Sequence, residues 1–490
     1  MNNEQGKRRV LIMRKQTKLV AVLSAAALLA IGASMTSFAA SGWTDQDGTW
    51  VYLDKDGERV TETWKKSANH YFWLDENGEM ATNAVIEDGD DTYYVNEKGA
   101  RVANQWVAVE NNDVCSDMEA DTVYFYFGST GKAYKDTNTT NGKKTINGYT
   151  YIFDDEGHMK YGWQEYDNNL YYLGEENEGW AATGWQYLEL DEDVIDSKED
   201  YDDEEWFWFD GSGKAARDKR KYIDKAYYTF DENGVMENKW VIGTPGAPAS
   251  GSSAYYDEEV GNQKTGWVYV VPEGKDEGDE EWFYLSSKGV PFNENGADAQ
   301  SATSNYAATA IKVEFGHDVK DTYNNVAARV IKNKTYLFDE NGAMLNGVYL
   351  LAQVRRVGGS SSLLGENGGI YYFNKGDGSV KGQMMTGKQT VTYDGDDYAY
   401  YFDSNGEAYL GALVDGSIYD GDGVRVESED GNALFNVEMD IKDKKGKVVI
   451  PTGSQVIIGT SGKVKKSGTV TIDGIKYTVK DYVATEKPEN

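Results

Sequence analysis

The sequence predicts an all-β protein, a solenoid-like array of stacked β-hairpins followed by a small C-terminal β module. Three observations indicate this fold class. Aromatic residues make up 13% of the chain, with 36 Tyr and 13 Trp, and they occur in strand-sized runs. The 54 glycines indicate many turns. An aromatic run followed by a turn recurs about thirteen times between residues 42 and 412, which is typical of a repeat architecture.

Residues 1–39 are interpreted as a cleaved export signal. Six basic residues precede an apolar run from Leu19 to Ile31, and Ser37-Phe38-Ala39 then offers small residues at the spacing that signal peptidase requires. A membrane anchor is the alternative interpretation, but the apolar run is shorter than the roughly 20 residues that span a bilayer. The chain is therefore expected to be secreted.

The chain is strongly acidic, with a formal net charge of −33. Without residues 1–39, which hold six basic residues and one acidic residue, 43 basic residues stand against 81 acidic ones. Such a surface repels nucleic acid and anionic bilayers, so neither is an expected partner after cleavage. Cys115 is the only cysteine, which excludes an intrachain disulfide and favours a Gram-positive bacterium over a eukaryotic secretory pathway.

Each repeat has the pattern of a β-hairpin. Aromatic and β-branched residues favour strands. The tetrapeptide Asp-Glu-Asn-Gly, at 75–78, 231–234 and 339–342, contains the Asn-Gly pair that supplies positive φ for a tight turn. A lone hairpin of this size is marginally stable in water, so neighbouring hairpins are expected to stack and bury their rings.

The run of aromatic residues at 206–209 shows why both faces of a hairpin are needed. Strand alternation sends Trp206 and Trp208 to one face and Phe207 and Phe209 to the other. We therefore expect one face to line the core and the other to meet the next hairpin.

Composition divides the chain into five predicted regions. These are a signal peptide, a first block of aromatic hairpin repeats, an irregular or inserted segment, a second block of aromatic hairpin repeats and a small β module, at 1–39, 42–294, 295–334, 335–412 and 413–490. The third region lacks the aromatic hairpin pattern, so the array is expected to bend, break or hold an insertion there. In the last region short β-rich runs alternate with Gly turns.

The repeat resembles the cell-wall-binding repeats of Gram-positive bacteria, of the choline-binding and glucan-binding type. The shared pattern is Gly-Trp, a spacer, Trp-Tyr-Tyr-aromatic, Asp-x-x-Gly, a Met and then Thr-Gly-Trp. It is followed at Gly42-Trp43, Trp50-Val51-Tyr52-Leu53-Asp54 and Gly57, and in part at Gly184-Trp185 and Gly266-Trp267. The resemblance spans about residues 42–412.

This resemblance implies aromatic cages between consecutive hairpins. A quaternary ammonium ion suits such a cage because a diffuse cation is attracted to ring faces without needing hydrogen bonds. By position, Trp43, Trp50 and Tyr71 form a first cage, and Trp64, Tyr71 and Met80 are parts of a second. The other predicted ligand-binding residues are Trp185, Trp206 and Tyr227 in a further cage, then Trp240, Trp267 and Trp282.

Several repeats depart from the cage pattern. The residue seven positions before the turn glycine, Trp50 in the first repeat, becomes Thr92, Thr150, Thr335 and Ala399 elsewhere. These units are not expected to build a full cage. More than half of the aromatic residues are expected only to hold hairpins together.

No catalytic site, dedicated metal site or cofactor is expected. His70, His158 and His317 lie far apart in the sequence, and no nucleophile elbow, Walker loop or dinucleotide fingerprint occurs. The acidic runs at 191–205 and 415–423 do not complete a calcium-binding loop. Most Asp residues fall at turns or in acidic runs, which does not favour a paired-carboxylate hydrolase.

The sequence therefore predicts a non-catalytic exported protein that binds a cell-wall polymer, a teichoic acid or a glycan, through its aromatic seams. Choline is a candidate ligand, and non-covalent retention on the wall is the expected location. Two alternatives stay open: a secreted adhesin for host or dietary glycans, and a wall hydrolase.

Overall fold

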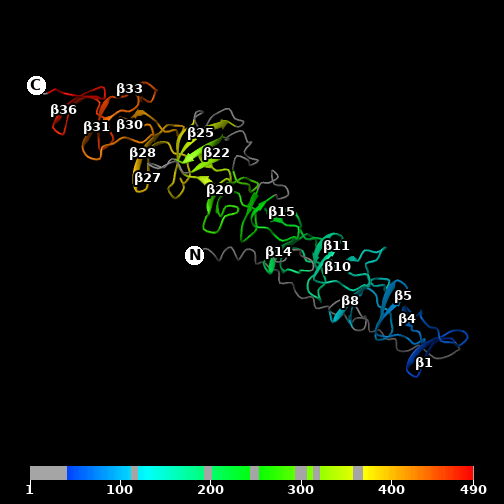
Figure 1. Cartoon of the computed structure of the whole chain (residues 1–490). Helices are drawn as coiled ribbons and strands as arrows, with labels where there is room; N and C mark the ends of the chain where they lie inside the picture. Colours follow the sequence, from blue (N-terminus) through cyan, green and yellow to red (C-terminus); the bar gives the residue numbers. More distant parts are fainter. Residues whose placement is uncertain are drawn as a thin grey trace. The chain divides into compact units, whose positions relative to one another are not determined.

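The computed structural model describes residues 41–111, 120–192, 201–242, 253–292, 306–312, 321–356 and 368–488. It places 37 strands among these residues, most of them in antiparallel pairs, which confirms the all-β prediction (Figure 1). The predicted signal peptide, Cys115 and His317 lie outside the described residues. None of the described residues forms a helix that is long and apolar enough to cross a membrane.

The chain divides into two compact units, residues 1–221 with 229–236 and residues 222–228 with 237–490. The first unit contains seven two-stranded antiparallel hairpins. They are β1 (Gly42–Gln46) with β2 (Thr49–Leu53), β3 (Thr63–Ser67) with β4 (His70–Leu74), β5 (Ala84–Asp88) with β6 (Asp91–Val95), β7 (Gln105–Glu110) with β8 (Thr122–Phe127), β9 (Lys143–Ile146) with β10 (Tyr149–Ile152), β11 (Trp163–Tyr166) with β12 (Asn169–Tyr172), and β13 (Gly184–Glu189) with β14 (Glu204–Phe209). A further hairpin, β15 (Lys219–Ile223) with β16 (Ala226–Phe230), contributes residues to both units.

The second unit combines hairpins with larger sheets. The hairpins are β17 (Lys239–Ile242) with β18 (Ser253–Tyr256), β19 (Gly266–Val270) with β20 (Glu281–Leu285), and β27 (Gly387–Tyr393) with β28 (Asp396–Phe402). Strands β31 (Asn432–Asn436) and β34 (Gln455–Gly459) form a further antiparallel pair, with two other strands between them in the sequence. A four-stranded sheet has the order β30 (Ser417–Tyr419), β29 (Ala412–Val414), β32 (Ile441–Lys442), β33 (Val448–Ile450). A three-stranded sheet has the order β35 (Gly468–Ile472), β36 (Ile475–Lys480), β37 (Val483–Glu486). Strands β29 to β37 lie in the region for which the sequence predicts a small C-terminal β module, and a separate module there stays a prediction.

A six-stranded sheet interrupts the series of hairpins in the second unit. Its order is β24 (Met344–Leu345), β23 (Lys334–Phe338), β22 (Thr322–Ile331), β21 (Tyr306–Lys312), β25 (Gly347–Arg356), β26 (Gly369–Phe373). Strands β21 and β22 come from the predicted irregular or inserted segment. They are the centre of the sheet, because β21 pairs with both β22 and β25. The repeats around residues 336 and 371 are therefore joined in one sheet.

The repeated Asp-x-x-Gly turns have a common local structure. In the second repeat, Asp75 Oδ1 accepts hydrogen bonds from the backbone N–H groups of Asn77 at 2.9 Å and Glu79 at 2.8 Å. The Gly78 N–H donates a hydrogen bond to the Asp75 carbonyl, which closes the turn. The φ of Gly78 is 74°, a backbone conformation that favours glycine. The turn aspartate thus satisfies backbone donors, as the sequence predicts.

In several repeats a backbone hydrogen bond ties the turn to the preceding hairpin. Met80, two residues after a turn glycine, donates its N–H to the Trp50 carbonyl at 2.8 Å. Arg101 donates to the Tyr71 carbonyl and Met159 to the Tyr124 carbonyl over the same distance. This bond sets the register in which consecutive hairpins stack.

The two faces of β14 are used as the sequence predicts. Phe207 and Phe209 are fully buried, whereas Trp206 and Trp208 on the opposite face are half-buried. The ring of Phe207 lies with its centroid 4.7 Å from that of Trp163, which belongs to the preceding hairpin. The core of the first unit is therefore a succession of small aromatic clusters between hairpins.

Candidate functional site

The first hairpin presents aromatic residues on one face. Trp43 is paired with Tyr52 and Trp50 with Asp45, so alternation places these four side chains on the same face. Val51 points to the opposite face and is fully buried. The hairpin thus offers a surface with three rings and a carboxylate to its neighbour or to solvent.

Trp43 contacts a neighbour of Tyr71, the residue that the sequence predicts beside it. The Trp43 ring meets Phe72 of β4 with a centroid distance of 5.4 Å and an interplanar angle of 73°. Tyr71 precedes Phe72 and so faces the other side of β4. We use the name Trp43 seam for Trp43 and Phe72, whose rings are in contact, together with Trp50 and Met80, which are joined by a backbone hydrogen bond. The structure does not bring Tyr71 to this seam.

Trp43 and Trp50 differ in their contacts within the Trp43 seam. Trp43 packs edge-on against Tyr52 and Phe72. Among the residues that the structure describes, no aromatic ring is in contact with the half-buried ring of Trp50. The Trp50 ring is therefore packed less against other described rings than the Trp43 ring.

Tyr71 belongs to a second group, Trp64, Tyr71, Tyr93 and Arg101, which we name the Trp64 seam. The Trp64 and Tyr93 rings meet nearly edge-on with centroids 5.1 Å apart. The carbon at the centre of the Arg101 guanidinium lies 4.3 Å from the Tyr71 centroid and 5.3 Å from those of Trp64 and Tyr93. A cation of the chain itself thus lies over the rings of this seam.

Two further predicted residues meet in the second unit. Trp267 and Trp282 lie with ring centroids 6.3 Å apart at an interplanar angle of 78°. Tyr336 meets Trp267 at 4.8 Å, and Met344 packs in the same cluster. We name these four residues the Trp267 seam. The sequence analysis missed Tyr336, although it lies six residues before its turn glycine, as Phe72 does.

A fourth group of this kind, the Trp106 seam, was also missed from the sequence. The Trp106 ring lies 4.9 Å from that of Tyr151 and 5.2 Å from that of Tyr126. Met159 is almost fully buried in the same cluster, and its backbone N–H donates a hydrogen bond to the Tyr124 carbonyl. The sequence signal that predicts this seam is a methionine two residues after the turn glycine, which recurs at Met80 and Met344.

The predicted cage at Trp185, Trp206 and Tyr227 is described in part. Trp185 and Trp206 lie on one hairpin with ring centroids 6.3 Å apart at 83°. Trp185 also meets Phe230 at 5.7 Å. Tyr227 is exposed and belongs to the second unit, so its place in this cage stays a prediction.

Trp240 borders a cavity of about 280 Å³ in the second unit. Tyr255 lies beside it, with ring centroids 5.0 Å apart, and Glu258 and Glu273 also line the cavity. The indole N–H of Trp240 donates to the Val271 carbonyl at 2.7 Å, which fixes the ring. Glu277 and the two lysines Lys239 and Lys275 complete the charged lining, so the cavity holds three carboxylates and two ammonium groups beside the two rings.

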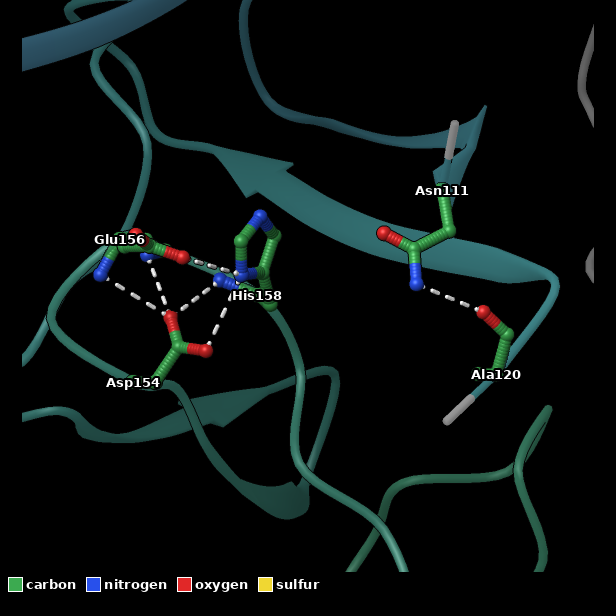
Figure 2. Close-up of polar contacts among 6 residues, drawn as sticks. Asn111, Ala120, Asp154, Glu156 and His158 are labelled. Atoms are coloured by element: carbon green, nitrogen blue, oxygen red, sulfur yellow. Dashed lines mark hydrogen bonds and ion pairs between the residues drawn. The ribbon is translucent and has the colours of Figure 1, made fainter. Parts of the chain in front are cut away.

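Asp154, Glu156 and His158 are the described group with metal-ligand chemistry (Figure 2). His158 Nδ1 lies 3.1 Å from Asp154 Oδ2 and 3.3 Å from Glu156 Oε2. The other oxygen of Asp154, Oδ1, accepts hydrogen bonds from the backbone N–H groups of residues 156–158. The buried His158 ring packs edge-on against Phe125. These contacts explain the cluster as part of a turn.

The same turn gives an expected pH dependence. Burial raises the pKa of Asp154, but the hydrogen bonds from His158 and the backbone outweigh it and hold the pKa below the ordinary 3.8. A lowered folded-state pKa contributes stability above pH 3.8 that is lost as the pH falls through the lower value. Asp154→Asn should therefore be less stable than the unsubstituted chain at pH 6, and the difference should shrink below pH 3.8.

Urea unfolding at several pH values checks this expectation. Asn96 occupies the equivalent turn position and accepts the same kind of backbone bonds, so the substitution keeps the turn. Asp155→Asn, at the exposed neighbouring position, is the matched control and should show no such difference. A difference for Asp154→Asn that does not change with pH would contradict the role of the carboxylate charge.

Comparisons with known proteins bear on these seams. Residues 140–185, which include β9 to β12, match the family described as choline-binding repeat. Over 332 residues the chain is 23% identical to Glucosyltransferase-S of Streptococcus mutans, a match that covers 61% of this chain and 21% of that protein. The chain thus spans about a fifth of the length of this curated relative.

Solved structures from Streptococcus pneumoniae are also similar. The modular autolysin LytC is 15% identical, with a TM-score of 0.35 over 62% of this chain and 52% of that chain. Choline binding protein F is 20% identical, with a TM-score of 0.26 over 80% of this chain and 100% of that chain. The family match confirms the predicted resemblance for residues 140–185, which carry repeats of the choline-binding type.

Proposed function

We propose that the chain is a non-catalytic exported protein that binds a polymer of the bacterial cell wall through its aromatic seams. The observation that carries this proposal is the Trp267 seam, where two half-buried tryptophan rings meet at 78° beside Tyr336 and Met344. Rings at a steep angle form a corner in which a quaternary ammonium group contacts two faces at once. The choline-binding repeat match supports this ligand class.

The proposed location follows from the same ligand. A chain with many weak sites on one wall polymer is held by avidity and needs no covalent link. Such a chain would be secreted and retained non-covalently, with a teichoic acid or a wall glycan as partner. The residues proposed to bind the polymer are Trp43, Trp50, Met80, Trp185, Trp206, Tyr227, Trp240, Trp267 and Trp282. Trp64 and Tyr71 are proposed as binding residues of a seam whose rings already contact the Arg101 guanidinium.

A second candidate function is glycan binding by a secreted adhesin. Tyr187 and Tyr269 are 48% and 54% exposed, and their rings lie 5.1 and 5.2 Å from those of Trp206 and Trp282. An exposed aromatic pair on a hairpin offers a flat apolar surface of the kind on which sugar rings stack. Host and dietary glycans therefore belong in the test of the proposal.

Wall binding should be released by choline. We expect the labelled chain to bind washed walls that contain phosphocholine, and free choline at millimolar concentration should elute it because it competes for the same ring faces. Walls that lack phosphocholine are the control for a choline-independent polymer. A glycan panel that binds the chain while both walls fail would favour the adhesin, and release of soluble wall fragments would favour a hydrolase.

A further inference from the structure

The Trp43 and Trp64 seams correspond position by position. Met80 and Arg101 each lie two residues after a turn glycine, and each forms an isolated β-bridge with the last residue of the preceding strand. Each also donates its backbone N–H to the preceding hairpin, to the Trp50 and Tyr71 carbonyls respectively, both at 2.8 Å. Arg101 therefore occupies in the second seam the place that Met80 occupies in the first.

The guanidinium of Arg101 has aromatic rings as its partners. Its central carbon lies 4.3 to 5.3 Å from the centroids of Trp64, Tyr71 and Tyr93, which come from β3, β4 and β6. Among the residues that the structure describes, Arg101 makes no ion pair with a carboxylate. A cation surrounded by rings and without an anion is the arrangement that an external quaternary ammonium ion would adopt in this cage.

The Arg101 side chain is also held from the side of the next turn. A Cβ atom added to Gly131 would lie 2.8 Å from Arg101 Nε and 3.1 Å from Arg101 Cδ, so the arginine packs directly on this glycine. Met80 packs on Gly99 in the same way, with 2.9 Å to both Sδ and Cε. The guanidinium is thus fixed between three rings on one side and a turn on the other.

An arginine at this repeat position does not by itself occupy a cage. Arg59, two residues after its turn glycine, donates instead to Gln46 Oε1 and to the Asn77 carbonyl, and it pairs with Glu79. Arg425 at the same position pairs with Glu427. The position of the Arg101 guanidinium therefore depends on the three rings of the Trp64 seam and not on the repeat position alone.

We propose that Arg101 is an internal ligand of the Trp64 seam, which closes this cage to cationic ligands from solution and leaves a quaternary ammonium site when Arg101 is replaced. The ligand class rests on the proposed function. An external cation would have to displace the guanidinium from three rings or lie beside it against like-charge repulsion. The Trp43 seam, with the neutral Met80, has no such competitor from this position. The residue two positions after the turn glycine would thus determine, for each seam, whether a cationic ligand from solution can bind there.

Calorimetric titration of the full chain with choline chloride tests this proposal. Arg101→Met places at this position the residue found at Met80, and Arg101→Ala places the residue found at Ala133, so other repeats already fold with both residues. Each variant should bind one equivalent of choline more than the unsubstituted chain. In the ¹H–¹⁵N spectrum, choline should shift the indole signal of Trp64 in the variants and leave it in place in the unsubstituted chain.

Arg59→Met is the matched control, because it removes an arginine at the same repeat position that contacts no cage, and it should bind as many equivalents as the unsubstituted chain. Equal stoichiometries for Arg101→Met, Arg101→Ala and the unsubstituted chain, whether zero or not, would overturn the proposal. If the unsubstituted chain binds no choline while the Arg101 variants bind one equivalent, the internal ligand is supported and choline is refuted as the natural ligand. The two proposals therefore fail through different outcomes.

Discussion

Phe207→Ala is expected to lower the unfolding free energy of the hairpins around it by about 3–5 kcal/mol. Phe207 is fully buried, and its ring lies 4.7 Å from Trp163 and 6.4 Å from Phe209. Truncation leaves a cavity between two hairpins that are each only two strands wide. Because the stability of a repeat array depends on interfaces between neighbours, amide hydrogen exchange should accelerate first in β11 to β14.

Tyr187→Ala is the matched control for Phe207→Ala. Tyr187 lies on the same hairpin but is 48% exposed, and its ring contact is with Trp206. Its loss should cost below about 1.5 kcal/mol, the scale of one aromatic pair. Equal losses from both substitutions, or exchange that accelerates evenly along the whole first unit, would contradict the role of Phe207 as an anchor between hairpins.

The hairpins could be predicted from sequence because their signals are local. Asp75 and Gly78 define a turn within four residues, and the aromatic run at 70–74 lies directly before it. The alternation that buries Phe207 and leaves Trp206 half-buried also follows from position along one strand. No information from distant residues is needed for either feature.

The six-stranded sheet could not be predicted from the same signals. Strands β21 and β22 read YAATAIK and TYNNVAARVI, with few aromatic residues and no Asp-x-x-Gly turn at their ends. Their partners decide their conformation, since β21 lies between β22 and β25 and pairs with residues far along the chain. Because this region lacks the aromatic hairpin pattern, the sequence predicts only an irregular or inserted segment here.

The composition of the cages depends on which face of each hairpin meets the next. Spacing places Tyr71 at the position of Trp50, but it does not tell whether Tyr71 or Phe72 faces Trp43. The structure pairs Trp43 with Phe72 and sends Tyr71 toward Arg101, a difference of one residue that exchanges the two faces of β4. The hydrogen bond from Met80 to Trp50, which fixes this stacking, leaves no trace in the sequence spacing.

Trp50→Ala is expected to weaken choline binding at the Trp43 seam about 2- to 30-fold, the effect of losing about 0.5–2 kcal/mol of cation–π attraction. The fold should be retained, because no described ring packs against Trp50 and its backbone hydrogen bond to Met80 does not involve the side chain. Avidity masks a single site in wall-binding assays, so the measurement must report one seam. The methyl signal of Met80 in a ¹³C-methionine spectrum does so, once it has been assigned with Met80→Leu.

Tyr71→Ala separates the two descriptions of this cage. If Trp43, Trp50, Phe72 and Met80 form the site, the choline titration of the Met80 signal should be unchanged in Tyr71→Ala, since the Tyr71 ring lies under Arg101 in the neighbouring seam. If Tyr71 completes the site with the two tryptophans, as its spacing suggests, both substitutions should weaken binding alike. A Met80 signal that choline does not shift in any of the three chains would contradict a cation site in the Trp43 seam and would assign these rings to packing alone.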